Sequence, residues 1–409
     1  MKTENRIDDT SFSNWKIKTA LFLSSQTISL FGSSLVQFAI IWYIARTTNS
    51  GIMITLSTIC AFLPQLGISL FAGVWADRYN RKLLIVLSDG LIAVSTLVLA
   101  IILLMGYESM WILFLVSGIR SFGAGIQMPA VNALIPQIVP EEKLMRVNGM
   151  NGTIQSLIFL VSPAVSGTIL TYGAFENILF VDVVTAAIGI SILLTLKVVP
   201  HKKALEKQDT DYFYDLKEGI KYSLSHSFIR HLLIFYAIFT FLIVPAAFLN
   251  VLMVTRTFGD EYWRLTANEM SFFVGSILGG IVMSTWGGFK NRIITIAVSC
   301  CAFGLLTVAV GVTKVFYVYL GIMVLTGMTM PFFNSPAMVL LQEKVEGDMQ
   351  GRVFSFIQIV SAGLMPLGMI LFGPLADIIR IEVLMIITGV LLIVLGISIF
   401  YNKEFIKEG

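Results

Sequence analysis

Long apolar stretches separated by short polar ones dominate the chain. A helix needs about 20 apolar residues to cross a bilayer, and twelve stretches approach or exceed that length. They cover 19–45, 52–76, 83–105, 111–135, 151–171, 177–197, 230–254, 267–288, 293–313, 315–340, 355–374 and 383–401. The pattern predicts an all-α membrane protein with twelve transmembrane helices.

Composition supports a membrane location. The chain is 56% hydrophobic and 13% charged, and its mean hydropathy is +0.85. A water-soluble core cannot cover that much apolar surface, so the chain needs lipid as solvent. The first residues, MKTENRIDDTSFSNWK, are too polar for a cleavable signal peptide. The three cysteines fall in the second and ninth stretches, which gives no sign of an extracellular disulfide framework.

The basic residues predict the orientation. With both termini placed inside, 22 of the 28 Lys and Arg residues fall on the cytoplasmic side, five fall outside and Arg120 falls within a span. Because Lys and Arg accumulate in cytoplasmic loops, we expect a multi-pass protein with both termini in the cytoplasm. The net charge of +3 reflects these loops and gives no reason to expect nucleic acid as a partner.

The chain divides into two similar halves. A polar linker over 198–229 separates a predicted N-terminal six-helix bundle, 1–197, from a C-terminal one, 230–409. GIQMPAVN (125–132) and GMTMPFFN (327–334) occupy corresponding spans of the two halves. Such pseudo-repeats are typical of transporters, which bind substrate between the halves near the midplane. Residues 215–230 of the linker and the start of the next span predict an amphipathic helix, whose simplest role is a tether.

A charged segment, GVWADRYNRK (73–82), lies between two apolar stretches. The preference of Lys and Arg for cytoplasmic loops explains its basic residues, but it does not explain Gly73 or Asp77. The segment resembles the GxxxDRxGRK loop of the major facilitator superfamily, with Asn80 at the second glycine, and Asn tolerates a left-handed turn. The matching residues, which the resemblance makes a gating motif, are Gly73, Asp77, Arg78, Arg81 and Lys82.

The resemblance also implies how this gate acts. The acid of the family's motif docks near the cytoplasmic end of the eleventh span and favours the outward-open state. In this chain that end lies close to Arg352 and Ser355. A contact made in one conformation and broken in another is what a gate requires.

Two further segments resemble motifs of drug transporters. Arg120, followed by SFGAG, resembles the second motif of the superfamily. SPAVSG (162–167) retains Pro163 and Gly167 of the bend-forming antiporter motif. RSFGAGIQMPAVNALIPQIVPEEKL and DLKEGIKY are similar to the bacterial macrolide-efflux branch of drug:proton antiporters. The resemblance implies proton-coupled export of hydrophobic drugs by alternating access in a bacterial cytoplasmic membrane.

Ionisable residues inside spans are the candidates for coupling. Charge in hydrocarbon is costly and indicates a partner or a water-filled path. Arg120 lies near the middle of its span, and Asp89 and Asp182 lie at depths close to it. Each aspartate either binds a proton or a substrate cation that competes with Arg120 for the carboxylate, or it only braces neighbouring helices. Glu269, near the outer end of the eighth span, is the next candidate.

Several polar and aromatic residues on expected cavity helices are candidates for substrate contact. An apolar cavity with aromatics and a few polar groups suits bulky amphipathic cations. Ordinary helix packing explains any single one of them equally well. They are Gln26, Gln37, Asn132, Gln155, Asn250, Phe332 and Asn334.

Other function classes lack sequence support. The chain has no HExxH or GxSxG motif for an intramembrane enzyme and no GxxxxGK[ST] motif for a nucleotide-driven pump. A receptor with a transporter fold, or an exporter of a siderophore, a lipid, a sugar or another metabolite, stays open. We expect a monomeric, non-enzymatic transporter that needs no cofactor and no metal, and whose partners are a small-molecule substrate, protons and the lipid bilayer.

Overall fold

The computed structural model describes residues 14–196, 198, 212–401 and 406–407, and every regular element in them is helical. These helices form two compact units. Unit 1 comprises Met1–Ile44 and Leu56–Gln208, and unit 2 comprises Ala45–Thr55 and Asp209–Gly409. The turn between the first two long helices therefore groups with unit 2, while the rest of both helices groups with unit 1.

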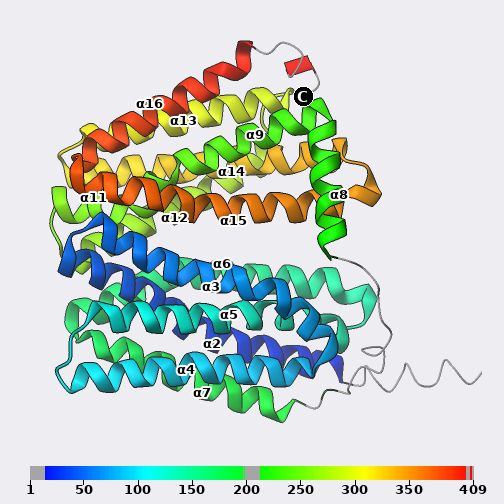
Figure 1. Cartoon of the computed structure of the whole chain (residues 1–409), viewed down its shortest axis with the longest axis vertical. Helices are drawn as coiled ribbons and strands as arrows, with labels where there is room; N and C mark the ends of the chain where they lie inside the picture. The colour runs from blue at the N-terminus through cyan, green and yellow to red at the C-terminus, as the bar shows by residue number, and fades with distance from the viewer. Residues whose placement is uncertain (1–13, 197, 199–211, 402–405, 408–409) are drawn as a thin grey trace, which may run out of the picture. The chain divides into compact units, whose positions relative to one another are not determined.

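Unit 1 is built from six long helices and one short turn of 3₁₀ helix. They are α2 (Trp15–Thr48), α3 (Gly51–Arg78), α4 (Arg81–Leu104), α5 (Met110–Ile138), η1 (Glu141–Lys143), α6 (Leu144–Tyr172) and α7 (Phe175–Thr195). Helix α4 packs against α5 and α7, as Figure 1 shows. A hydrophobic core in this unit joins α2, α4 and α5. It includes Phe22, Ile85 and Leu134.

Unit 2 contains nine helices within the described residues. They are α8 (Tyr212–Ser225), α9 (Ser227–Leu242), α10 (Val244–Phe248), α11 (Asn250–Thr257), α12 (Tyr262–Trp286), α13 (Arg292–Val312), α14 (Phe316–Lys344), α15 (Gly347–Ile378) and α16 (Ile381–Tyr401). The pairs α13 and α16, and α12 and α14, pack along most of their length (Figure 1). Glycine permits this, since a Cβ on Gly304 of α13 would lie 2.6 Å from the carbonyl oxygen of Gly389 in α16.

The predicted fold class is confirmed, with one difference in the seventh span. Among the described residues, eleven helices are long and apolar enough to cross a membrane. The prediction of one continuous helix over 230–254 is wrong, because this segment breaks into α9, α10 and α11. Pro245, at the start of α10, has no N–H to donate and cannot continue α9.

The expected linker helix is present but ends earlier than predicted. Helix α8 stops at Ser225, and the residues after it begin α9. It crosses the ends of α9 and α15 in Figure 1 and packs against both. The Glu346 N–H donates to the Tyr222 hydroxyl at 3.3 Å, and Arg352 of α15 pairs with Glu218 at 3.5 Å. This part of the linker is therefore packed on unit 2, and residues 199–211 lie outside the described ones.

Candidate functional site

The candidate gating motif covers the turn between α3 and α4. Asn80 caps the N-terminus of α4, since the Leu83 N–H donates to its side-chain oxygen at 3.3 Å. Its φ of −66° and ψ of 110° are extended, so Asn80 does not use the left-handed conformation that asparagine tolerates. An N-cap residue needs extended backbone to turn its side chain back onto the first free N–H groups of the helix.

Two of the motif's bases join helices of unit 1. Arg81 donates from Nε to the Ala76 carbonyl and from Nη1 to the Ala133 carbonyl, both at 2.8 Å. Lys82 donates from Nζ to the carbonyls of Leu194 and Leu196, also at 2.8 Å, where α7 ends. A cation at a helix C-terminus satisfies carbonyls that have no partner within the helix. These two bases therefore stabilise unit 1 in addition to any role in gating.

The other members of the motif are less constrained. Arg78 is exposed, and no described atom lies within 4 Å of a Cβ added at Gly73. The side chains of Asp77 and Ser355 lie outside the described residues. Docking of Asp77 near the start of α15 therefore stays a prediction.

A buried charge cluster joins α2, α4, α5 and α7 in unit 1. Arg120 donates from Nη1 to the Asp182 carboxylate and to the Thr96 hydroxyl, and from Nη2 to the Ser33 carbonyl at 3.3 Å. Asp182 also accepts from the hydroxyls of Ser33, at 3.1 Å, and Thr96, at 3.0 Å. Arg120 is 9% exposed and Asp182 is fully buried. Of the two candidate aspartates, the structure thus pairs Asp182 with Arg120.

Asp89 occupies a different environment in the same unit. Its Oδ1 accepts from the Gln127 amide at 2.5 Å, and Ser29 of α2 lies next to the same carboxylate. Its Oδ2 is buried without a hydrogen-bond partner among the described residues. A carboxylate with an unused oxygen can gain a proton there without breaking a contact.

Sequence reasoning missed three partners of these acids. Ser33, Thr96 and Gln127 each donate to a candidate aspartate. Gln127 could have been identified from the sequence, because it follows Arg120 by two helical turns and so lies near the same face of α5. Ser33 and Thr96 could not have been singled out, since small hydroxyl residues occur throughout the spans.

Unit 2 contains a second polar cluster, centred on Glu269 of α12. The Glu269 carboxylate accepts from the side chains of Asn250, in α11, and Asn268, the latter at 3.4 Å. The Tyr319 hydroxyl of α14 donates to the Asn268 oxygen at 2.6 Å. Asn268 and Tyr319 are fully buried, whereas Glu269 is half-buried. Neutral side chains thus hold this acid in place, and no cation among the described residues is paired with it.

The candidate antiporter motif lies inside α6. This helix continues from Leu144 to Tyr172 through Pro163, and both Pro163 and Gly167 are buried. The neighbouring Ser166 hydroxyl donates to the Leu35 carbonyl of α2 at 2.8 Å. The motif therefore packs α6 against α2.

The candidate cavity residues fall into three groups by exposure. Gln37, Asn132 and Asn334 are exposed, whereas Gln155 and Phe332 are half-buried. Gln26 and Asn250 are buried, and each has one side-chain atom, Nε2 of Gln26 and Oδ1 of Asn250, without a partner among the described residues. The next aromatic after Phe332, Phe333, belongs to the core of unit 2, where it stacks on Phe239 with ring centroids 3.6 Å apart.

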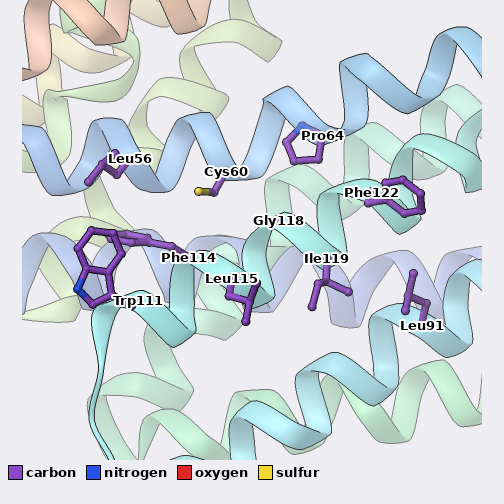
Figure 2. Close-up of a pocket in the computed structure, with 10 residues that line it drawn as sticks. All are labelled: Leu56, Cys60, Pro64, Leu91, Trp111, Phe114, Leu115, Gly118, Ile119 and Phe122. Atoms are coloured by element: carbon purple, nitrogen blue, oxygen red, sulfur yellow. The ribbon is translucent and has the colours of Figure 1, made fainter.

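Unit 1 also has an apolar groove between α3, α4 and α5. Its volume is about 770 Å³, and Figure 2 shows the side chains that line it. They are Leu56, Cys60, Pro64, Leu91, Trp111, Phe114, Leu115, Gly118, Ile119 and Phe122. None of the candidate site residues lines it. Its walls carry too few polar groups to orient a ligand.

The described residues include no group of three or more His, Cys, Asp or Glu side chains placed to hold a metal. Instead, the described residues provide three carboxylates, Asp182, Asp89 and Glu269, with two kinds of partner; the two aspartates are buried and Glu269 is half-buried. One is neutralised by a guanidinium, and the other two are held by neutral donors. Such groups can accept a proton or a ligand cation within the membrane.

Comparisons with known proteins bear on the whole chain. The model of the Major Facilitator Superfamily matches residues 22–369. Macrolide efflux protein A of Streptococcus pyogenes is 28% identical over 388 residues, which cover 94% of this chain and 96% of that protein. The staphyloferrin A transporter of Staphylococcus aureus is 21% identical over 399 residues, 95% of this chain and 97% of that one.

Among solved structures, a bacterial homologue of the human lysosomal transporter Spinster shares the fold with a TM-score of 0.71. It is 15% identical, and the match covers 96% of this chain and 98% of that one. A likeness at that level of identity shows the fold alone.

Proposed function

The chain belongs to the Major Facilitator Superfamily, and from this premise we propose that it exports hydrophobic, amphipathic drugs of the macrolide type in exchange for protons. Membership makes it a multi-pass secondary transporter and not an enzyme. The observation that carries the substrate class is the 28% identity to macrolide efflux protein A over 94% of the chain.

Asp89 is the proposed proton carrier. It is 2% exposed, its Oδ1 accepts from Gln127, Ser29 lies beside the same carboxylate, and its buried Oδ2 has no partner of hydrogen-bond geometry among the described residues. A proton added at Oδ2 neutralises the carboxylate and leaves the Gln127 contact in place. Asp182 is less suited, because protonating it removes the counter-charge of Arg120.

Glu269 is the proposed contact for a cationic drug. Its partners Asn250 and Asn268 are neutral, so its negative charge is not compensated by a described neighbour. A half-buried carboxylate held by neutral amides attracts a protonated amine more strongly than one already paired with Arg or Lys. The amphipathic rest of such a drug suits apolar and aromatic surroundings.

Alternating access is the proposed transport step, with GVWADRYNRK as one gate. Asp77 makes its contact in one conformation only, as the superfamily motif implies, and so biases the equilibrium between the two. Both termini face the cytoplasm in this proposal, as the distribution of bases predicts.

A vesicle assay tests the proposal. Purified protein is reconstituted into liposomes, a proton gradient is imposed, and uptake of a panel of macrolides is measured with and without an uncoupler. We expect gradient-dependent accumulation that the uncoupler abolishes and that Asp89→Asn abolishes as well. Accumulation that survives the uncoupler would exclude proton exchange, and absence of uptake for the whole panel would exclude the macrolide class.

A second candidate function is export of an iron-chelating metabolite. The 21% identity to the staphyloferrin A transporter over 95% of the chain supports it. Drug susceptibility and siderophore secretion of cells that lack the protein distinguish the two. Loss of secretion with unchanged macrolide susceptibility would favour this alternative.

A further inference from the structure

The first part of the gating motif occurs a second time in the chain. GVWAD (73–77) and GPLAD (373–377) share glycine, alanine and aspartate at equivalent positions. Asp77 is the penultimate residue of α3, and Asp377 is the penultimate residue of α15. Equivalent positions at two helix ends predict equivalent tasks for the two carboxylates.

Asp377 closes the N-terminus of α3. Its Oδ1 accepts from the Gly51 N–H at 2.6 Å, and its Oδ2 accepts from the Ile52 N–H at 2.9 Å and from the Ser50 hydroxyl at 2.8 Å. The first N–H groups of a helix have no partner within that helix, and its N-terminus favours negative charge. The acid that ends α15 thus serves as the capping group of a helix far away in sequence.

Arg256 of α11 completes this contact. Its Nη2 donates to Asp377 Oδ1 and to the Asn49 carbonyl, both at 2.7 Å. Asn49 has a φ of 47°, a left-handed conformation that asparagine tolerates better than most residues. The turn 49–52, Asp377 and Arg256 together form what we call the α3 latch.

Glycine brings the two helices into direct contact at the latch. A Cβ added at Gly373 would lie 1.6 Å from the Thr55 Oγ1, and one added at Gly51 would lie 2.1 Å from the Gly373 carbonyl oxygen. The Thr55 hydroxyl donates to the Met369 carbonyl at 3.0 Å. At Gly73, by contrast, an added Cβ would have no described atom within 4 Å. The second glycine is therefore packed in the same structure in which the first is open.

We propose that GPLAD is a second gate, opposite in action to GVWADRYNRK. The α3 latch holds in the state described by the structure, with Gly373 packed, and it is released in the state in which Asp77 makes its contact. Helix α3 then links the two gates, because its N-terminus is held by Asp377 and its C-terminus carries Asp77. A contact present in one state alone shifts the equilibrium toward that state by its own free energy.

Release of the latch rests on the alternating-access step of the proposed function and is independent of the substrate and of proton coupling. Its test therefore uses protein in lipid nanodiscs without any drug, where both faces are accessible. Thr55 is 5% exposed, so the thiol of Thr55→Cys reacts with a hydrophilic maleimide only when the latch opens. Cys60, Cys300 and Cys301 are replaced by Ala in this background.

Two independent variants open the latch. Asp377→Asn removes the charge and Gly373→Ala inserts a methyl group where Thr55 lies, and each should raise the labelling rate about tenfold. The matched controls are Glu343→Gln, whose carboxylate pairs with Arg292 away from the latch, and Gly363→Ala, where an added Cβ meets no described atom within 4 Å. Both should leave the rate unchanged. Asp77→Asn should lower the rate, because it weakens the opposing gate.

A merely structural role would give a different result. In a parallel sample Cys300, which is fully buried in α13, is kept as the only thiol and reports unfolding. The proposal requires faster labelling of Thr55→Cys while Cys300 stays protected. It is overturned if Asp377→Asn and Gly373→Ala leave the rate at position 55 unchanged, or if that rate rises only together with labelling of Cys300.

Discussion

Replacing Asp182 by Asn tests whether its pairing with Arg120 is structural. The substitution keeps the size of the side chain and removes the counter-charge of a guanidinium that is 9% exposed. The oxygen of the Asn side chain can still accept a hydrogen bond. Its NH₂ group, however, replaces the second carboxylate oxygen of Asp182 and cannot accept from the donors that surround it. Arg120 is then left with the Ser33 carbonyl and the Thr96 hydroxyl as its partners.

The expected loss of stability on Asp182→Asn follows from the position of the Arg120–Asp182 pair in the membrane span. Arg120 lies about 15 Å along α5 from Met110, well inside the span. Removing one partner of a buried ion pair costs about 3–5 kcal/mol, and an arginine at the centre of a membrane helix costs about 3 kcal/mol. We therefore expect Asp182→Asn to lower the free energy of unfolding by about 3 kcal/mol, which is about 150-fold in the equilibrium constant.

Asp89→Asn is the matched control. Its amide oxygen can still accept from Gln127, and no cation loses a partner, so we expect a cost of about 1 kcal/mol or less. The assay is denaturant unfolding of each purified variant in the same micelle, followed by drug export at several pH values. Asp89→Asn should abolish proton-driven export at every pH tested, in a protein of normal stability.

A double variant, Arg120→Gln with Asp182→Asn, sharpens the test. Removing both charges should recover most of the stability lost by Asp182→Asn, with a coupling energy of about 1–3 kcal/mol. The reasoning is refuted if Asp182→Asn is no less stable than Asp89→Asn, or if the double variant is as unstable as the two single ones combined.

Three further predictions concern gating, substrate and topology. Asp77→Asn should insert normally but transport drug poorly in the vesicle assay, and unchanged transport would leave this acid without a gating role. Glu269→Gln should weaken export of cationic drugs at least about tenfold more than export of neutral ones, as competition assays would show; equal losses would contradict its proposed role. Cysteines at Glu108 and Glu176 should react with an impermeant reagent outside intact cells, and those at Asn80 and Asn291 should not; the reverse pattern would contradict the predicted orientation.

Hydropathy predicted the helices well because each span must bury its own backbone in lipid. It failed over 230–254, where most residues are apolar but Pro245 interrupts the backbone hydrogen bonds. A hydropathy average counts side chains and ignores missing N–H donors. The proline was visible in the sequence, but prolines 129 and 163 lie within unbroken helices, so a proline alone does not locate a break.

The candidate site was predictable in depth but not in pairing. Counting residues brought Asp89, Asp182 and Arg120 to similar levels, and the structure pairs Arg120 with Asp182 alone. That choice depends on the rotation of α4 and α7 about their axes, which one apolar helix sequence does not specify. Asp377 was overlooked for a related reason. In the sequence it is only a charged residue at the end of a span, and its contact with the N-terminus of α3 is known only from the structure.

The contacts of each buried acid separate a structural task from a transporting one. Asp182 accepts from three side chains, Arg120, Ser33 and Thr96, so any change in its protonation disrupts several contacts at once. Asp89 has a buried oxygen without a described partner, which is a cost to the fold that ordinary packing would remove. A group that must gain and lose a proton in each cycle has to keep such an oxygen available, because a fully satisfied carboxylate resists protonation. The incomplete hydrogen bonding of Asp89, more than its depth, is therefore the reason to place proton exchange there.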